Sequence, residues 1–155
     1  MIIRQAELRD VAQVSAFLEE LVALGKRSLP ADPDYVRDVY VGHEDNISCA
    51  VADDDGNILG LQVLKLAREG NPYGTAAGWG IIGTHVNPKA ARRGVGKQLF
   101  AVTRSKALAA GLRKIDAAIG AQSAEALGYY DAMGFRTFRQ DSERVNKVFE
   151  VSAPA

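Results

Sequence analysis

Apolar residues near the start of the chain recur every three or four positions, the spacing of one face of an α-helix. This stripe consists of Val11, Val14, Leu18 and Leu21. Asp10, just before the stripe, predicts an N-cap, and Gln13 predicts the matching half of a capping box. Gly25 follows the stripe and predicts the end of the helix. Before the helix, Ile2 and Ile3 indicate a short strand.

A strand period of two replaces the helical period in the next part of the chain. Residues 47–52 and 59–63 follow that period, and the sequence Asp-Asp-Asp-Gly-Asn at 53–57 predicts a tight turn between them. A hairpin is therefore expected, preceded by a short helix at 35–41. The later pattern predicts strand, helix, strand, helix, strand and strand at 79–86, 95–110, 114–119, 123–133, 135–139 and 144–151.

The strand, helix and strand between residues 79 and 119 imply a parallel pair joined by a right-handed crossover. The other strands are expected to be antiparallel. The pattern thus predicts a mixed, mostly antiparallel sheet flanked by helices, in the α/β class. Gly78, Gly80 and Gly83 are unusual so close together in a strand, and they indicate a bulge or the close approach of a ligand.

Composition narrows the class of protein. The chain has 155 residues, which predicts a single domain over residues 1–155. Hydrophobic residues make up 47% and charged residues 25%, as in globular proteins. Lys and Arg number 19 and Asp and Glu number 19, so the formal net charge is zero. We therefore expect neither a dedicated nucleic-acid binder nor a polybasic membrane binder.

Two further features indicate a cytoplasmic protein. Cys49 is the only cysteine, so no disulfide can form within the chain. Charged residues follow closely after Met1, which leaves no apolar region of a signal peptide there. The longest uncharged run, at 70–87, contains a proline and five glycines, which is unlike a transmembrane helix.

The junction between the strand at 79–86 and the helix at 95–110 carries the first candidate chemistry. Gly94 and Gly96 stand where the helix is expected to begin, next to basic side chains. A helix start offers unpaired N–H groups and a positive dipole end to an anion such as phosphate. A P-loop is excluded because Ala91 and Gln98 stand where a P-loop requires Gly and Ser or Thr. A dinucleotide-binding fingerprint is excluded because Leu99 stands where its third Gly is required. A phosphate site and a solvated basic turn both remain open at this point.

A second motif, at residues 126–135, completes the pattern: Ala-Leu-Gly-Tyr-Tyr-Asp-Ala-Met-Gly-Phe. The two motifs together resemble the GNAT superfamily of acyl-CoA-dependent N-acetyltransferases. The matching residues are Val86, Pro88, Gly94, Gly96, Ala126, Tyr130, Gly134 and Phe135. The match in residues covers about 84–135, and the order of elements fits nearly the whole chain. The resemblance implies the fold of that superfamily, in which two neighbouring parallel strands splay apart around coenzyme A.

Carried over by position, the resemblance implies a binding site for acetyl-CoA as co-substrate, with no metal. Its pyrophosphate would meet the loop and helix start formed by Arg92, Arg93, Gly94, Val95, Gly96 and Lys97. Its pantetheine arm would bond to the backbone of Thr84, His85 and Val86. Two positions depart from the family: Ala91 replaces a Gln or Arg, and Ser123 replaces an Asn that binds pantetheine. A serine hydroxyl can still form a hydrogen bond, with shorter reach.

The implied reaction is direct attack of a primary amine, on a small molecule or protein, at the thioester. Tyr130 matches the general acid that protonates the leaving thiolate, since a phenol pKa of about 10 keeps the proton until then. The alternative is a core aromatic residue, and Tyr129 is expected to pack. The general base has no clear candidate. Gly80 and Ala118 occupy the positions where the family often has a carboxylate. The imidazole ring of His85 has a suitable intrinsic pKa for a base, and the alternative is that only the backbone of His85 takes part.

The loops at 26–33 and 68–78 are expected to wall the acceptor side. Three classes of function remain in play: an N-acetyltransferase, a non-catalytic acyl-CoA sensor or interaction subunit of the same fold, and a nucleotide-phosphate protein. The Tyr130 motif and the failed P-loop match favour the first. Expected partners are acetyl-CoA and an amine acceptor, without nucleic acid or membrane. Edge strands near the C-terminus also allow a homodimer.

Overall fold

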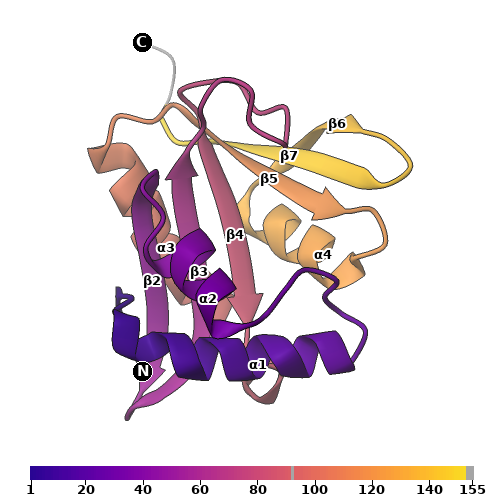
Figure 1. Cartoon of the computed structure of the whole chain (residues 1–155). Helices are drawn as coiled ribbons and strands as arrows, with labels where there is room; N and C mark the ends of the chain where they lie inside the picture. Colours follow the sequence, from indigo (N-terminus) through magenta and orange to yellow (C-terminus); the bar gives the residue numbers. More distant parts are fainter. Residues whose placement is uncertain (92, 153–155) are drawn as a thin grey trace.

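A computed structural model describes residues 1–91 and 93–152, and within them the strands form one seven-stranded sheet in the order β1-β2-β3-β4-β5-β7-β6 (Figure 1). The strands are β1 (Ile2–Gln5), β2 (Asn46–Asp54), β3 (Asn57–Leu66), β4 (Gly80–Val86), β5 (Lys114–Gly120), β6 (Arg136–Gln140) and β7 (Arg144–Glu150). The β4–β5 pair is parallel and the other pairs are antiparallel. The mixed α/β sheet expected from the sequence is confirmed.

Helices cover both faces of this sheet (Figure 1). They are α1 (Val11–Ala23), α2 (Pro33–Tyr35) continued by a π-helix (Val36–Val41), α3 (Val95–Ala109) and α4 (Ala124–Met133), with 3₁₀ turns at Leu8–Asp10 and Pro88–Ala90. Every element occurs in the expected order, with ends that agree within a few residues. Among the described residues, no helix has the length and apolar character needed to cross a membrane.

Side-chain alternation along β2 divides the core into layers on the two faces of the sheet. Cys49 and Val51 pack with α1, whereas Ala50 and Ala52 pack with α3. The two alanines have small side chains, so α3 can lie close to the strand. A third cluster, around Phe100, lies between α3, α4 and the β5–β7 part of the sheet.

The start of α1 differs from the expected capping box. The Asp10 side chain does not cap α1; it accepts hydrogen bonds from the backbone N–H of Glu7 and from the Arg4 guanidinium, the latter at 2.8 Å. Gln13 instead bonds to the β2–β3 turn, at the Gly56 carbonyl and the Ile58 N–H. The predicted N-cap lies three residues too late, because the helical backbone begins with the 3₁₀ turn at Leu8, where Glu7 is the N-cap and Asp10 the third residue of its capping box. Arg4, on β1, adds a charged partner for the same carboxylate.

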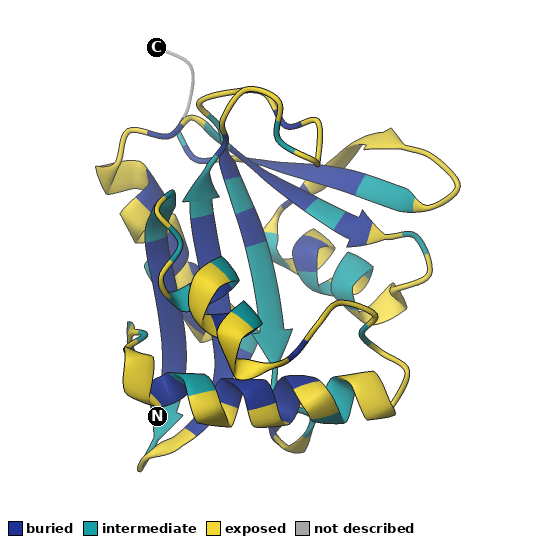
Figure 2. Ribbon diagram, viewed as in Figure 1, coloured by how far each residue is buried: buried dark blue, intermediate teal, exposed yellow. Residues whose placement is uncertain are grey.

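Burial along β4 sets this strand apart. β4 lies in the middle of the sheet, where strands are usually covered on both faces. Yet five of its seven residues are only half-buried, whereas its neighbour β3 is buried over most of its length (Figure 2). A central strand with this much exposure must lack a neighbour along part of its edge.

Candidate active site

The missing neighbour of β4 is β5, because these two strands diverge (Figure 1). Within the described residues they pair only at Gly80 with Ile115 and at Ile81 with Asp116. Beyond that point β4 continues along β3 as far as Val86, while β5 continues along β7. The splayed parallel pair expected from the resemblance is therefore present, and it opens toward the start of α3.

The closed end of the splay is tightly packed. A Cβ atom on Gly80 would lie 2.8 Å from Leu64 Cδ1 and 2.9 Å from Leu112 Cδ1. Gly80 is thus required by side-chain packing, and the expected approach of a ligand there is not what the structure shows. This position could not hold a catalytic carboxylate, since a larger side chain would displace the core.

A buried polar group also ties the closed end together. The Asp116 carboxylate, fully buried, accepts hydrogen bonds from the Thr75 hydroxyl at 2.6 Å and from the Asn146 amide at 3.1 Å. These contacts hold the β3–β4 loop and β7 against β5. Each carboxylate oxygen of Asp116 therefore has a donor within the protein, and Asp116 does not line the neighbouring cavity.

The open end of the splay leads to the predicted anion-binding loop. Gly94 has a φ of 73°, in the left-handed region that glycine adopts without strain, and α3 begins directly after it. The first turn of the 15-residue helix α3 is formed by Val95, Gly96 and Lys97. The N–H groups of these three residues have no partner within the helix. The backbone donors expected from the sequence are thus in place. Arg92 lies outside the described residues.

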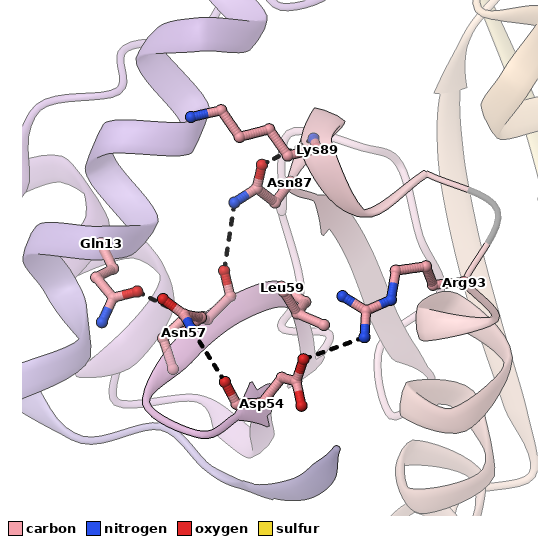
Figure 3. Close-up of a pocket in the computed structure, with 8 residues that line it drawn as sticks. Gln13, Asp54, Asn57, Leu59, Asn87, Lys89 and Arg93 are labelled. Carbon is pink, nitrogen blue, oxygen red and sulfur yellow. Dashed lines mark hydrogen bonds and ion pairs between the residues drawn. The ribbon is translucent and has the colours of Figure 1, made fainter.

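The Arg93 side chain points toward the β2–β3 hairpin. Its guanidinium pairs with the Asp54 carboxylate at 3.1 Å, at the wall of a polar cavity of about 330 Å³ (Figure 3). Both side chains are partly exposed, and ion pairs of that kind contribute about 0–1 kcal/mol. Arg93 can therefore exchange Asp54 for a phosphate at little cost, while Lys97 is exposed near the helix start.

α4 brings Tyr130 to the open part of β4. The Tyr130 hydroxyl lies 2.8 Å from Thr84 Oγ1, and the ring packs on Phe135 with a centroid distance of 5.0 Å. Tyr130 is 5% exposed, and this burial raises the pKa of its phenol above the usual value. Tyr130 can therefore be a core aromatic residue and a candidate acid at once, because its ring belongs to the core and its hydroxyl reaches the splayed strand.

Tyr129 and Gln62 form a second link, which sequence reasoning missed. The Tyr129 hydroxyl donates to the Gly96 carbonyl at 2.7 Å and accepts from Gln62 Nε2 at 2.9 Å. A Cβ atom on Gly96 would lie 2.5 Å from Tyr129 Cε1, so the glycine makes room for this ring. The one signal for Gln62 was an amide in the middle of an otherwise apolar strand.

His85 lies on the opposite face of β4 from Thr84. Its ring stacks at 5.0 Å from the Tyr40 ring, and Tyr40 accepts a hydrogen bond from Arg27 at 2.9 Å. Burial, assisted by the positive charge of Arg27, lowers the pKa of His85 to about 3. Moving a proton from an ammonium of pKa near ~10 to such an imidazole is uphill by about 7 units, or ~10 kcal/mol. The ring is therefore poorly suited to act as general base.

The opposite wall of the splay comes from β5 and the start of α4. Ser123, in the pantetheine position of the family pattern, is exposed and directly precedes α4. Its backbone N–H donates to the Gly120 carbonyl at the end of β5. Ser123 and Val86 thus stand at the open ends of the two diverging strands, where the resemblance expected them.

A cavity of about 590 Å³ opens beside β5. Its lining comes from the α1–α2 connection and α2, the β3–β4 loop, the end of β5, and the β6–β7 turn with the first residue of β7. The residues are Ser28, Leu29, Tyr35, Tyr73, Ala118, Ile119, Gly120, Asp141, Glu143 and Arg144. Both loops expected to wall the acceptor side contribute to it. Arg68 pairs with Asp45, and Trp79 packs beside Phe138, and neither side chain lines this cavity.

Metal chemistry has no candidate centre in the part of the chain that is described. No group of three or more His, Cys, Asp or Glu residues in residues 1–91 and 93–152 is arranged to hold a metal ion.

Sequence and structure comparisons agree with this architecture. The acetyltransferase (GNAT) family model matches residues 14–135, and the chain belongs to that family. Acetyl transfer is the class of reaction that defines it. No curated protein sequence matches significantly.

Solved structures show the same fold. A GCN5-related N-acetyltransferase from Kribbella flavida has a TM-score of 0.80 at 21% identity, covering 96% of each chain. The yncA protein of Salmonella typhimurium, solved with its cofactor acetyl-CoA, has a TM-score of 0.72 at 16% identity, covering 99% of this chain and 95% of that one. A ribosomal-protein-alanine N-acetyltransferase from Brucella melitensis has a TM-score of 0.74 at 17% identity, covering 97% and 99%.

Proposed function

We propose that this protein transfers an acetyl group from acetyl-CoA to a primary amine of a small molecule or protein, with Tyr130 as general acid. One observation carries the proposal. β4 and β5 pair over two residue pairs and then diverge, and the Tyr130 hydroxyl lies against Thr84 where they are apart. A gap of this kind offers strand backbone to an extended arm of a ligand and a proton donor to its reacting end.

Acetyl-CoA fits the groups around this gap. The first N–H groups of α3, at Val95, Gly96 and Lys97, carry the positive end of the helix dipole and suit a pyrophosphate. The backbone of Thr84, His85 and Val86 would bond the pantetheine arm, with the exposed Ser123 hydroxyl on the opposite wall. These ligand roles come from the family pattern, and the arrangement of the donors supports them.

The reaction requires one bond to form and one to break. The neutral amine nitrogen bonds to the acetyl carbon, the carbon–sulfur bond breaks, and the sulfur takes the proton of Tyr130. The nitrogen releases one proton to water as it becomes an amide, and water returns a proton to the Tyr130 phenolate. Burial raises the pKa of the phenol, and it also raises the pKa of a thiol formed beside it. The two pKa values therefore rise together, and a positioned acid of this kind contributes about 10²–10⁴-fold to the rate.

None of the three positions weighed for the general base is suited to deprotonate the amine. The side chains of Leu64 and Leu112 fill the space beside Gly80. Ala118 carries no acid–base group, and the pKa of His85 is about 3. The acceptor would therefore react from its neutral form, after losing its proton to water in the cavity beside β5. The rate should rise with pH until the pKa of the acceptor amine is reached.

A thermal-shift titration with acetyl-CoA, coenzyme A and ATP side by side tests the proposal. A ligand that binds only the native state stabilises it by about 2.7 kcal/mol at 100 times its Kd. We expect both coenzyme A species to raise Tm and ATP to leave it unchanged. A panel of primary amines, followed by release of free thiol, then tests transfer. No response to coenzyme A would overturn the proposal, and binding without transfer to any amine would favour a non-catalytic acyl-CoA sensor.

A further inference from the structure

A buried glutamine links the start of α3 to the candidate acid. Gln62 lies on β3 directly opposite Thr84 and is fully buried. Its Nε2 atom is 2.9 Å from the Tyr129 hydroxyl and 2.9 Å from Thr84 Oγ1. Tyr129 in turn contacts the Gly96 carbonyl, and Thr84 contacts the Tyr130 hydroxyl. Four side chains therefore form one continuous hydrogen-bonded row.

The direction of the first bonds follows from counting protons. The Gly96 carbonyl can only accept, so the single proton of the Tyr129 hydroxyl is directed to it. The Tyr129 oxygen must then accept from Gln62, which requires the amide nitrogen on that side. With the amide reversed, Tyr129 would have one proton for two acceptors, so the reversed orientation is excluded.

The direction continues through Thr84. The two hydrogens of Gln62 Nε2 go to Tyr129 and Thr84, so the Thr84 oxygen accepts. The next hydroxyl bonded to Thr84 Oγ1 is that of Tyr130, at 2.8 Å, and either oxygen can be the donor of that bond. A hydroxyl that accepts a hydrogen bond becomes a stronger donor, so the bond from Gln62 favours the arrangement in which Thr84 donates to Tyr130. In that arrangement the Tyr130 proton is free to point into the splay.

The row is retained at a cost to the core. Gln62 Oε1 is buried without a hydrogen-bond partner among the described residues. A leucine or methionine at the same place would avoid an unsatisfied polar atom. The amide is better explained by what its nitrogen does for Thr84 and Tyr129 than by packing.

We propose that Gln62 is a positioning residue for proton delivery: through Thr84 it turns the Tyr130 proton outward, toward the sulfur of the leaving coenzyme A. This inference rests on the proposed role of Tyr130 as acid. Without the Gln62 donor, Thr84 loses this bias and accepts from Tyr130 as readily as it donates. When Thr84 accepts, the Tyr130 proton is directed inward and has to leave that bond before it reaches the sulfur.

The test measures kcat and KM for acetyl-CoA from thiol release above the uncatalysed rate, with an acceptor that the amine panel identifies. Gln62→Met keeps the length of the side chain and removes its donors. We expect kcat to fall about 10-fold, with KM for acetyl-CoA unchanged. Thr84→Val removes the inward acceptor together with the donor, so the Tyr130 proton has no inward bond to leave and kcat should fall less than in Gln62→Met. Gln140→Met, on the exposed edge strand β6, is the matched control and should leave both constants unchanged.

Repeating Gln62→Met in the Tyr130→Phe background separates positioning from general damage. If Gln62 acts through Tyr130, the second change has no further effect on kcat there. An equal loss in both backgrounds, or an unchanged kcat for Gln62→Met, overturns the inference. If Tyr130→Phe itself leaves kcat unchanged, the acid role fails instead. No thiol release by the unaltered protein overturns the proposed function and this inference with it.

Discussion

Thr84 and His85 are neighbours on β4, yet the two faces of the strand place them in opposite surroundings. The Thr84 face holds uncharged partners, Gln62 and Tyr130, joined by hydrogen bonds of 2.8–2.9 Å. The His85 face holds an aromatic ring, Tyr40, with the Arg27 guanidinium on its hydroxyl at 2.9 Å. The Thr84 face therefore suits a neutral proton donor, whereas the His85 face disfavours any added positive charge.

This difference explains why the site has a candidate acid and lacks a candidate base. Burial raises the pKa of Tyr130, so the phenol keeps its proton at physiological pH. Burial and Arg27 lower the pKa of His85, so the imidazole stays neutral and does not take a proton. The same loss of solvent thus acts in opposite directions on the two groups, because one is charged without its proton and the other with it.

The largest effect should come from removing the hydroxyl on the Thr84 face. We expect Tyr130→Phe to lower kcat by about 10²–10⁴-fold, the usual contribution of a positioned acid, with Kd for acetyl-CoA nearly unchanged. Tyr40→Phe removes a hydroxyl from the His85 face and is the matched control, with a far smaller expected effect on kcat. Steady-state kinetics together with a binding titration would measure both. Equal values of kcat for the two variants would remove the distinction between the faces.

A second effect concerns the contact between α3 and α4 on the Thr84 face. Gly96→Ala would place a methyl group 2.5 Å from Tyr129 Cε1. We expect a loss of about 1–3 kcal/mol in the free energy of unfolding, measured in urea, and weaker binding of acetyl-CoA.

Gly128→Ala is its control on α4. A Cβ atom there meets nothing within 4 Å, and alanine favours a helix over glycine by roughly 0.5–1 kcal/mol. That variant should be as stable as the parent or slightly more so. Equal stability of Gly96→Ala and the parent would show that the Tyr129 ring can move aside.

A smaller effect is expected on the other face. His85→Gln keeps a polar side chain and removes the imidazole. Since the pKa of His85 is about 3, we expect kcat to change less than about 10-fold, below the 10²–10⁴-fold contribution of a general base. The dependence of the rate on pH should follow the acceptor amine in both proteins. A large fall in kcat, with the pH dependence lost, would assign the imidazole a proton-transfer role.

The smallest effect is expected at Cys49, which lies on the same face of the sheet as His85 and whose thiol should not react in the native protein. Burial raises the pKa of its thiol to about 12. An aromatic disulfide reagent at pH 8 should therefore leave the native thiol unmodified and react promptly in urea. Because this pKa lies above the unfolded value of about 8.5, the thiol's contribution to stability is complete below that pH and is lost as the pH rises toward 12. Rapid labelling of the native protein would mean that this face opens readily.

Much of the fold was predictable because its signals are local. Apolar spacing, turn residues and glycines at helix ends each act over a few positions, and the order of elements was predicted correctly from them. The family pattern also anticipated the divergence of β4 and β5. The N-cap predicted at Asp10 was wrong because the helical backbone begins three residues earlier, after Glu7.

The candidate site was predictable where a motif names a residue, and it was missed where a residue acts through neighbours from other elements. Gly80 indicated a ligand, but its reason is the packing of Leu64 and Leu112 against it. Tyr129 was interpreted as a packing residue, although its hydroxyl joins α4 to the Gly96 carbonyl. In each case the decisive atom belongs to a segment far away along the chain.

The amino-acid sequence specified the elements, their order and the family, because periodicity, turn chemistry and motif spacing are properties of short stretches of chain. The tertiary structure decided which polar groups are joined by hydrogen bonds. Gln62, Thr84, Gly96 and Tyr130 come from β3, β4, α3 and α4, and the direction of the bonds between them depends on how many donors and acceptors meet in one buried place. It likewise set the low pKa of His85, because folding buries the imidazole and brings the Arg27 guanidinium to the same face of β4.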